Sequence, residues 1–149
     1  MRHGHAPTSA EAGVKSDILR PLSDKGRREA RLMTEEILKR GGRPSLILHS
    51  PLLRAVQTAE IAALALNAAG EPFPPLDNTQ PAEEVLAALE KMAAAGDEPL
   101  AVGHQPQIGE LAALLTGEIF EIRPAGIVAV EWASRPRLLW SLNADELRS

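Results

Sequence analysis

The sequence predicts an α/β fold, a three-layer sandwich with a mostly parallel central sheet and helices on both faces. Three observations predict it: short apolar runs that suit buried strands, longer amphipathic runs that suit helices, and the alternation of the two along the 149-residue chain. The length favours a single domain over residues 1–149, and no repeat, low-complexity tract or long linker divides it.

The first half of the chain contains two expected helices around one strand. Ser23 is placed to cap a helix that runs to about Arg40, where two glycines follow. The run SLILH at 45–49 has the apolar character of a buried strand. The segment SPLLRAVQTAEIAALALNAAG, 50–70, is expected to be a helix with Ser50 as its N-cap and a proline in its first turn.

The second half continues the alternation. EPFPPLDN is rich in proline and can form an edge strand at best. Two further helices are expected on either side of a buried strand, and the chain closes with a strand pair that could add an antiparallel edge. The segments are 71–78 for the edge strand, 81–96 and 106–117 for the helices, 99–104 for the buried strand, and 126–133 with 137–142 for the closing pair.

Composition excludes several classes of function. The net charge is −4 with acids and bases interspersed, and two Phe, two Trp and no Tyr offer little to stack on bases, which argues against a nucleic-acid partner. The absence of cysteine excludes disulfides and thiolate catalysis. No run reaches the roughly 18 apolar residues of a membrane span, and no apolar signal region follows the first charges. We therefore expect a cytoplasmic protein with no membrane partner.

Cationic and histidine side chains stand at the strand-to-helix junctions. RHG lies at the start of the chain, HSPLLRAVQT follows the first expected strand, and HQP follows PLAVG. The carboxyl ends of parallel strands meet at one crevice. The segment LRPLSDKG adds an arginine just before a helix. The crevice is expected to hold five such groups, with no carboxylate to neutralise them: Arg2, His3, Arg20, Arg54 and His104.

This cluster favours an anionic ligand, because like charges repel at short range. A phosphoryl group suits arginine forks, and Arg54 in the first turn of its helix adds the N–H groups of the helix N-terminus. Neutral imidazole is a nucleophile toward phosphorus, which indicates a phosphohistidine intermediate that water later hydrolyses. Arginines and a second histidine can stabilise the charge without a metal or another cofactor.

RHG, SPLLRAVQT and GHQP, in this order, resemble the histidine phosphatase superfamily, also called the phosphoglycerate mutase-like fold. The short length and RPLSDKG narrow the resemblance to the small bacterial SixA-type phosphohistidine phosphatases. The resemblance implies that His3 is the phosphorylated nucleophile. It implies that Arg2 and Arg54 bind the phosphoryl group, that His104 donates a hydrogen bond to its oxygens, and that Arg20 completes the pocket.

The resemblance also implies a reaction and a partner. SixA-type enzymes remove phosphate, without a metal, from phosphohistidine on histidine-containing phosphotransfer proteins. The expected function is therefore protein phosphohistidine dephosphorylation in bacterial phosphorelay signalling.

Two features depart from the family pattern. Members carry an apolar strand before RHG, whereas only Met1 precedes Arg2, so the first strand is expected to be largely absent from the chain. Many members also use an acid after the middle strand to protonate an alcohol leaving group. The matching segment LDNTQPAEEV offers Glu83 and Glu84, and more loosely Asp77, as a possible general acid. A phosphoramidate is easily protonated on nitrogen, which favours phosphohistidine as substrate.

Two other functions fit the same residues. A small-molecule phosphomonoesterase would act on sugar or nucleotide phosphates and would depend on Glu83 or Glu84. A catalytically silent module would bind phosphorylated ligands without turning them over. The sequence leaves both open.

Overall fold

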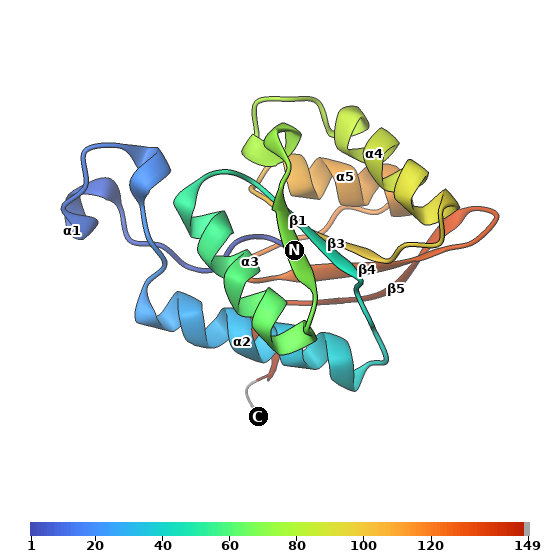
Figure 1. Ribbon diagram of the computed structural model, residues 1–149, viewed down its shortest axis with the longest axis horizontal. Coiled ribbons are helices and arrows are strands. Elements are labelled where there is room, and N and C mark those ends of the chain that lie inside the picture. Colours follow the sequence, from blue (N-terminus) through green and yellow to red (C-terminus); the bar gives the residue numbers. More distant parts are fainter. Residues whose placement is uncertain (148–149) are drawn as a thin grey trace.

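The protein folds into a three-layer α/β sandwich, described for residues 1–147 by a computed structural model (Figure 1). Its strands are β1 (Leu46–His49), β2 (Ala69–Pro72), β3 (Pro99–Val102), β4 (Ile127–Trp132) and β5 (Pro136–Leu142). Its α-helices are α1 (Ser9–Ala12), α2 (Asp24–Lys39), α3 (Leu53–Leu66), α4 (Ala82–Ala94) and α5 (Gln107–Thr116), and its 3₁₀ turns are η1 (Asp17–Leu19), η2 (Pro74–Asp77) and η3 (Ala144–Leu147).

The central sheet is parallel, with strand order β2-β1-β3, and β4 and β5 form a separate antiparallel hairpin. Helices α2 and α3 cover one face of the parallel sheet, and α4 and α5 cover the other (Figure 1). Each face has its own core, one around Met33 and Ile47, the other around Leu48, Val85 and Leu111. Adjacent residues of β1 point to opposite faces, so Ile47 and Leu48 belong to different cores. The predicted sandwich is confirmed.

The end of α3 and the extent of the edge strand differ from the sequence-based expectation. Helix α3 ends at Leu66 because Asn67 takes the left-handed conformation, with φ 52°, and its N–H bonds back to Ala63. The edge strand therefore starts earlier than expected, at Ala69, and pairs with β1 only as far as Pro72. The prolines that follow lack backbone donors, and the chain turns into η2 instead of continuing the strand.

The segment 1–3 lies between the two sheets. Gly103 N–H donates to the Met1 carbonyl and His3 N–H donates to the Gly103 carbonyl, both at 3.0 Å. On the other side, Arg2 N–H donates to the Gly126 carbonyl at 2.9 Å. The contact with β3 is a parallel bridge between Arg2 and Gly103. The expected place of a first strand is thus marked by one bridge, held by hydrogen bonds on both sides.

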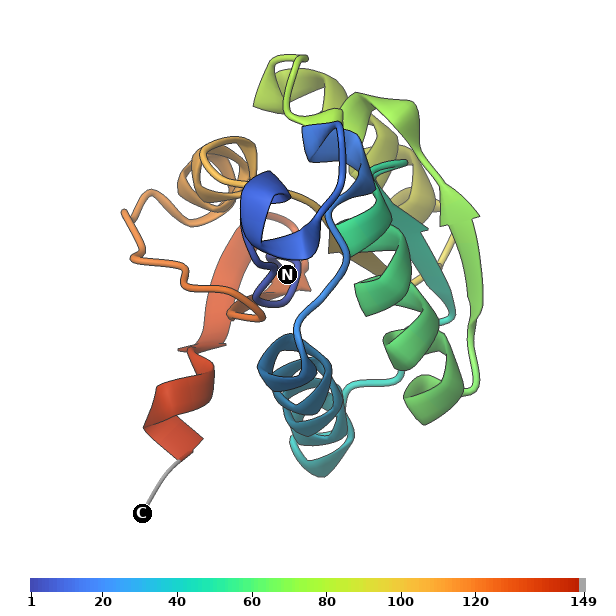
Figure 2. The same ribbon diagram turned by 90° about the vertical axis from the view of Figure 1, so that its left-hand side faces the viewer.

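The sequence pattern did not predict the structure of residues 6–20, because α1 and η1 are too short to show helical periodicity. Thr8 caps α1 and exchanges capping-box hydrogen bonds with Glu11, and Ser16 caps η1. Figure 1 shows α1 at one end of the molecule, whereas the N-terminus lies near the middle, and in Figure 2 the α1 end faces the viewer. None of the helices within residues 1–147 has the length and apolar character needed to cross a membrane.

Candidate active site

His3 is held by hydrogen bonds to its backbone, to the peptide after it and to one nitrogen of its ring. Its carbonyl accepts a hydrogen bond from Ala125 N–H at 3.0 Å, and the next peptide N–H, that of Gly4, donates to Thr58 Oγ1 at 2.9 Å. The ring nitrogen Nδ1 lies 2.7 Å from the Gly4 carbonyl oxygen. Because a carbonyl can only accept, this contact places the ring hydrogen on Nδ1. Nε2 of His3 then carries the free lone pair that a nucleophile needs.

The loop after His3 packs directly against the start of α2. A Cβ added to Gly4 would lie 2.8 Å from the Gly26 carbonyl oxygen, and one added to Gly26 would overlap the backbone of His5. Ser23, the N-cap of α2, donates its backbone N–H to the His5 carbonyl at 2.9 Å. Two glycines and a cap thus bring helix and loop together and fix the position of His3.

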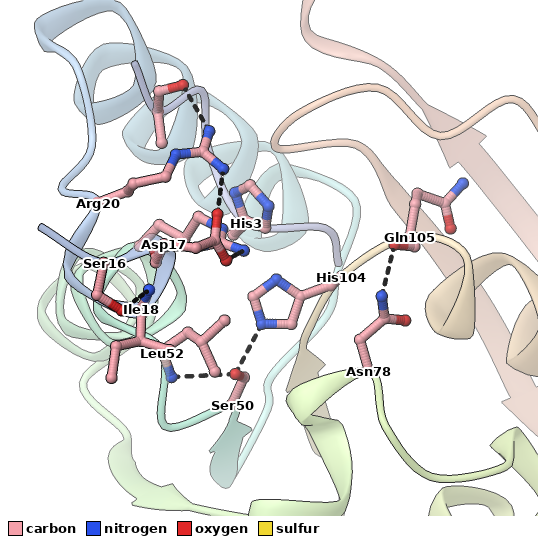
Figure 3. A network of polar contacts seen from close by, with 12 residues as sticks. His3, Ser16, Asp17, Ile18, Arg20, Ser50, Leu52, Asn78, His104 and Gln105 are labelled. Atoms are coloured by element: carbon pink, nitrogen blue, oxygen red, sulfur yellow. Dashed lines mark hydrogen bonds and ion pairs between the residues drawn. The ribbon is translucent and has the colours of Figure 1, made fainter. Parts of the chain in front are cut away.

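His104 faces His3 across the site. It follows β3, and its ring centroid lies 5.0 Å from that of His3. Its Nε2 lies 2.7 Å from Ser50 Oγ, and Ser50 Oγ also accepts the Leu52 N–H at 3.1 Å (Figure 3). Its Nδ1 is buried without a hydrogen-bond partner. Ser50 was expected to cap α3, but α3 starts at Leu53 and Ser50 is a contact of His104.

Arg2 and Arg54 each present an unpartnered buried nitrogen. Arg2 Nη1 donates to the Ile122 carbonyl at 2.9 Å, and Arg54 Nη1 donates to the Asp17 carbonyl at 2.9 Å, yet Nε of both side chains has no partner. A buried N–H left without an acceptor costs free energy, about 1–3 kcal/mol, unless a ligand or water supplies one. Together with Nδ1 of His104, the Nε atoms of Arg2 and Arg54 make three buried nitrogens that have no hydrogen-bond partner in the protein.

Arg20 lies at the rim and is largely engaged with backbone. Its Nε donates to the Pro7 carbonyl at 2.7 Å and its Nη2 to the Ala6 carbonyl at 3.1 Å. Nη1 donates to Asp17 Oδ1 at 2.9 Å. Arg20 thus joins the two ends of segment 6–20 by hydrogen bonds and also lines the cavity.

These side chains line one cavity of about 430 Å³, large enough for a phosphorylated side chain. A second cavity, of about 320 Å³, lies beside β3 and β4, is lined mainly by apolar side chains and contains neither histidine of the site. Among the described residues, no group of three His, Asp or Glu side chains is placed to hold a metal ion. The 430 Å³ cavity is lined by Arg2, His3, Asp17, Arg20, Leu52, Arg54, Asp77, Asn78, Thr79, His104 and Gln105.

The cavity contains carboxylates, contrary to the expectation that none neutralises the cationic cluster. Asp17 Oδ2 lies 3.1 Å from Arg54 Nη2. Asp77, the last residue of η2, also lines the cavity. Asp17 stands three residues before Arg20, a spacing at which opposite charges meet within one turn, so the sequence did carry a signal for it. Glu83 and Glu84 lie in the first turn of α4, exposed and outside the cavity lining.

Burial makes both histidines of the site poor bases. Desolvation, followed by smaller contributions that include the nearby charges of Arg54 and Arg2, lowers the pKa of His3 to about 3. Desolvation and then the charge of Arg54 lower the pKa of His104 to about 4. Both rings are therefore neutral at pH 7, and the positive charge of the cavity comes from its guanidinium groups. Such a site can bind an oxyanion and offer it a neutral imidazole nitrogen.

The sequence predicted the arginines and histidines of this site but not the residues that hold them. The structure brings together His3, His104, Arg2, Arg54 and Arg20, all expected in one crevice. Thr58 was not among the expected site residues, and its Oγ1 accepts the Gly4 N–H next to His3. Its place four residues after Arg54, on the same helix face, was the available signal.

Comparison with known proteins shows which family the chain belongs to. The profile of the histidine phosphatase superfamily (branch 1) matches residues 1–80. Phosphohistidine phosphatase SixA of Escherichia coli is 30% identical over 155 residues, which covers 99% of this chain and 94% of SixA. An uncharacterised protein of Picosynechococcus is 38% identical over 136 residues, covering 87% of this chain and 81% of that protein.

Solved structures agree with the sequence relatives. The structure of the protein histidine phosphatase SixA complexed with tungstate superimposes with a TM-score of 0.90 at 30% identity, covering 99% of this chain and 97% of that chain. A mycobacterial glucosyl-3-phosphoglycerate phosphatase shares the fold, with a TM-score of 0.66 at 18% identity, covering 93% and 95% of the two chains. The chain is thus a phosphatase that belongs to the histidine phosphatase superfamily.

Proposed function

We propose that this phosphatase removes phosphoryl groups from phosphohistidine side chains of partner proteins in bacterial phosphorelay signalling, with His3 as its nucleophile. The observation that carries the proposal is the 2.7 Å contact between His3 Nδ1 and the Gly4 carbonyl, which leaves Nε2 unprotonated in a cavity lined by guanidinium groups. The similarity to SixA, which is named a phosphohistidine phosphatase, supports the substrate class.

The first step transfers the phosphoryl group from one imidazole to another. The lone pair of His3 Nε2 attacks phosphorus, a P–N bond forms, and the P–N bond to the substrate imidazole breaks. When the second ring nitrogen of the substrate carries a proton, the leaving imidazole departs neutral with the electron pair of the broken bond. The bond made and the bond broken are of the same kind, so this step needs no added proton.

The second step is hydrolysis of the phosphorylated His3. Water attacks phosphorus, a P–O bond forms, the bond to His3 Nε2 breaks, and the ring recovers its lone pair. The attacking water gives its proton to solvent, and inorganic phosphate leaves. His3 returns to the neutral form that its lowered pKa, about 3, maintains at pH 7.

The other residues stabilise the phosphoryl group along this path. Nε of Arg2 and Nε of Arg54, both buried and unpartnered, donate to its oxygens. His104 donates from Nδ1, since the Ser50 hydroxyl can donate its hydrogen to Nε2. Arg20 closes the rim. These donors and charges supply the stabilisation that phosphoryl transfer requires, and no step calls for a metal or a cofactor.

The choice between phosphohistidine and an alcohol ester depends on a proton donor. An alkoxide leaving group needs an acid, and the carboxyl group of Asp17 has its pKa held below the usual value, first by hydrogen bonds from Arg20, which keeps it ionised. Glu83 and Glu84 lie outside the cavity lining, and Asp77, the looser candidate, lines the cavity with its Oδ1 accepting two hydrogen bonds from Thr79. A phosphoimidazole needs no such donor, so this cavity suits it better than a sugar or nucleotide phosphate.

The test compares phosphate release from a phosphohistidine protein and from a sugar phosphate, using wild-type protein, His3→Ala and a Glu83→Gln/Glu84→Gln double variant. We expect turnover of the phosphohistidine protein that is lost in His3→Ala and kept in the double variant. Preference for the sugar phosphate with dependence on Glu83 or Glu84 would indicate a phosphomonoesterase. Vanadate binding without turnover of either substrate would indicate a silent binding module.

A further inference from the structure

The side chain of Asp17 bridges two arginines that line the cavity with it, and Figure 3 shows its contact with Arg20. Its Oδ1 accepts from Arg20 Nη1 at 2.9 Å and its Oδ2 from Arg54 Nη2 at 3.1 Å. The Asp17 side chain is 59% exposed, whereas that of Arg54 is 9% exposed. A carboxylate that is over half exposed thus rests on the outer edge of a buried guanidinium, whose inner nitrogen Nε remains unpartnered.

Carboxylates bring the charge of the cavity close to balance. Three guanidinium groups line it, those of Arg2, Arg20 and Arg54. The carboxylates of Asp17 and Asp77 contribute two negative charges. Both histidines are neutral at pH 7, with pKa values of about 3 and about 4. The cavity therefore carries one net positive charge.

One net positive charge matches some phosphorylated ligands better than others. A phosphoryl group carries a charge of nearly −2 at neutral pH. Free phosphate or a phosphate ester would leave the occupied cavity negative. A phosphoimidazole whose second nitrogen is protonated carries one compensating positive charge, and the occupied cavity is then close to neutral. The charge balance thus favours a substrate with a cationic leaving group.

We propose that Asp17 is a specificity-determining residue that selects phosphorylated, protonated imidazole over phosphate esters and free phosphate. Its exposed carboxylate stabilises the positive charge on the substrate ring, because opposite charges at close range favour each other's charged form. The protonated ring is the one that departs neutral when its P–N bond breaks. The same carboxylate repels free phosphate, which promotes release of the product. This proposal rests on the phosphohistidine function proposed above.

A purely structural Asp17 would behave differently. If the carboxylate only held Arg54 and Arg20 in place, its removal would weaken every phosphorylated ligand in parallel. Removal of a discriminating charge would instead move phosphoimidazole and oxyanions in opposite directions. The ratio between them separates the two roles.

The experiment uses Asp17→Asn, which keeps the shape and one oxygen acceptor but removes the charge, with Asp17→Glu as the variant that restores it. Glu60→Gln is the matched control, since Glu60 is exposed on α3, the helix that carries Arg54, and lies outside the cavity lining. The measurements are kcat/KM for phosphoimidazole and for p-nitrophenyl phosphate, the inhibition constant of vanadate, and a thermal melt of each protein.

In Asp17→Asn we expect kcat/KM for phosphoimidazole to fall by about three- to tenfold and vanadate to bind more tightly by a similar factor, a modest change because solvent screens an exposed carboxylate. Hydrolysis of p-nitrophenyl phosphate should hold or rise, Asp17→Glu should recover part of the preference, and Glu60→Gln should match wild type. A parallel loss on both substrates with weaker vanadate binding would overturn the proposal, as would an unchanged ratio.

The outcomes separate this proposal from the function beneath it. If the wild-type protein hydrolyses p-nitrophenyl phosphate but not phosphoimidazole, the proposed function is wrong and the role of Asp17 is wrong with it. If the wild-type protein hydrolyses phosphoimidazole and Asp17→Asn leaves the substrate ratio unchanged, only the role of Asp17 is wrong.

Discussion

The hydroxyl oxygen of Ser50 lies 2.7 Å from Nε2 of His104, joining the residue after β1 to a residue that follows β3. Ser50 Oγ already accepts the N–H of Leu52, so its own hydrogen is available for Nε2. When Ser50 donates this hydrogen to Nε2, the ring hydrogen of His104 sits on Nδ1, the buried nitrogen that has no partner in the protein. One hydroxyl thereby decides whether His104 offers the cavity a donor or a lone pair.

Replacement of Ser50 by Ala should lower kcat by roughly tenfold, because His104 then loses the partner that keeps its hydrogen on Nδ1. The ¹⁵N chemical shifts of the His104 ring should report a shift in tautomer population, which a purely structural role for Ser50 would not produce. The Leu52 N–H also loses its acceptor, so stability should fall by about 1 kcal/mol. Unchanged ring shifts with normal kcat would contradict this role.

Replacement of Arg54 by Ala should weaken vanadate binding by at least about tenfold, since the buried guanidinium contributes a full charge and an unpartnered Nε. Arg54→Lys should recover only part of the affinity, because an ammonium group cannot reproduce the fork. Arg28→Ala, which removes an exposed cation on α2, is the control and should leave affinity unchanged. Equal vanadate affinity in Arg54→Ala and wild type would count against the site.

The two buried histidines should make the folded state sensitive to acid. The folded-state pKa values of His3 and His104, about 3 and about 4, are lowered mainly by desolvation, whereas both rings titrate near 6.5 in the unfolded chain. Between these values the unfolded state binds more protons. The stability gained from neutral histidines is therefore complete above about pH 6.5 and is lost as the pH falls toward the folded-state values.

Replacement of His104 by Gln should flatten this pH dependence by about 1 kcal/mol per pH unit between roughly pH 6 and 5. Urea unfolding across that range measures the slope, and His5→Gln, which changes an exposed histidine, is the control. Parallel curves for His104→Gln and wild type would show that His104 is not held neutral by burial.

Replacement of Gly26 by Ala should destabilise the protein by about 2–3 kcal/mol, because a Cβ there overlaps the backbone of His5 and forces α2 and the loop apart. Gly70→Ala is the matched control, since its Cβ would meet only ordinary contacts, the nearest at 3.8 Å. Thermal unfolding of both variants tests the difference. Equal melting temperatures would mean that α2 and the loop after His3 do not pack as described.

The layers of this fold could be predicted because they depend on local patterns. The helical face of Ala30, Met33 and Ile37 repeats at the helical period, and the caps at Ser23 and Gly117 stand where helices begin and end. The cationic part of the site was equally predictable, because parallel strands bring their carboxyl ends to one edge.

The rest of the site depends on contacts between distant segments. Asp17 reaches Arg54 across 37 positions, and Ser50 reaches His104 across 54. No periodicity or spacing indicates such pairs. The capping role expected for Ser50 was a reasonable local interpretation, and a tertiary contact replaced it. The conformation of residues 6–20 also escaped prediction, because its helical turns are single and Arg20 donates hydrogen bonds to carbonyls 13 and 14 positions before it.

The hydrogen bonds of residues 1–3 place the nucleophile between the parallel sheet and the antiparallel hairpin, and connect it to both. His3 takes a hydrogen bond from Ala125 on the hairpin side and gives one to Gly103 on the side of the parallel sheet. Displacement of one sheet relative to the other breaks these hydrogen bonds and moves His3. Loss of activity should therefore run ahead of loss of helical signal as denaturant rises, so that the enzyme stops working while most of its secondary structure remains.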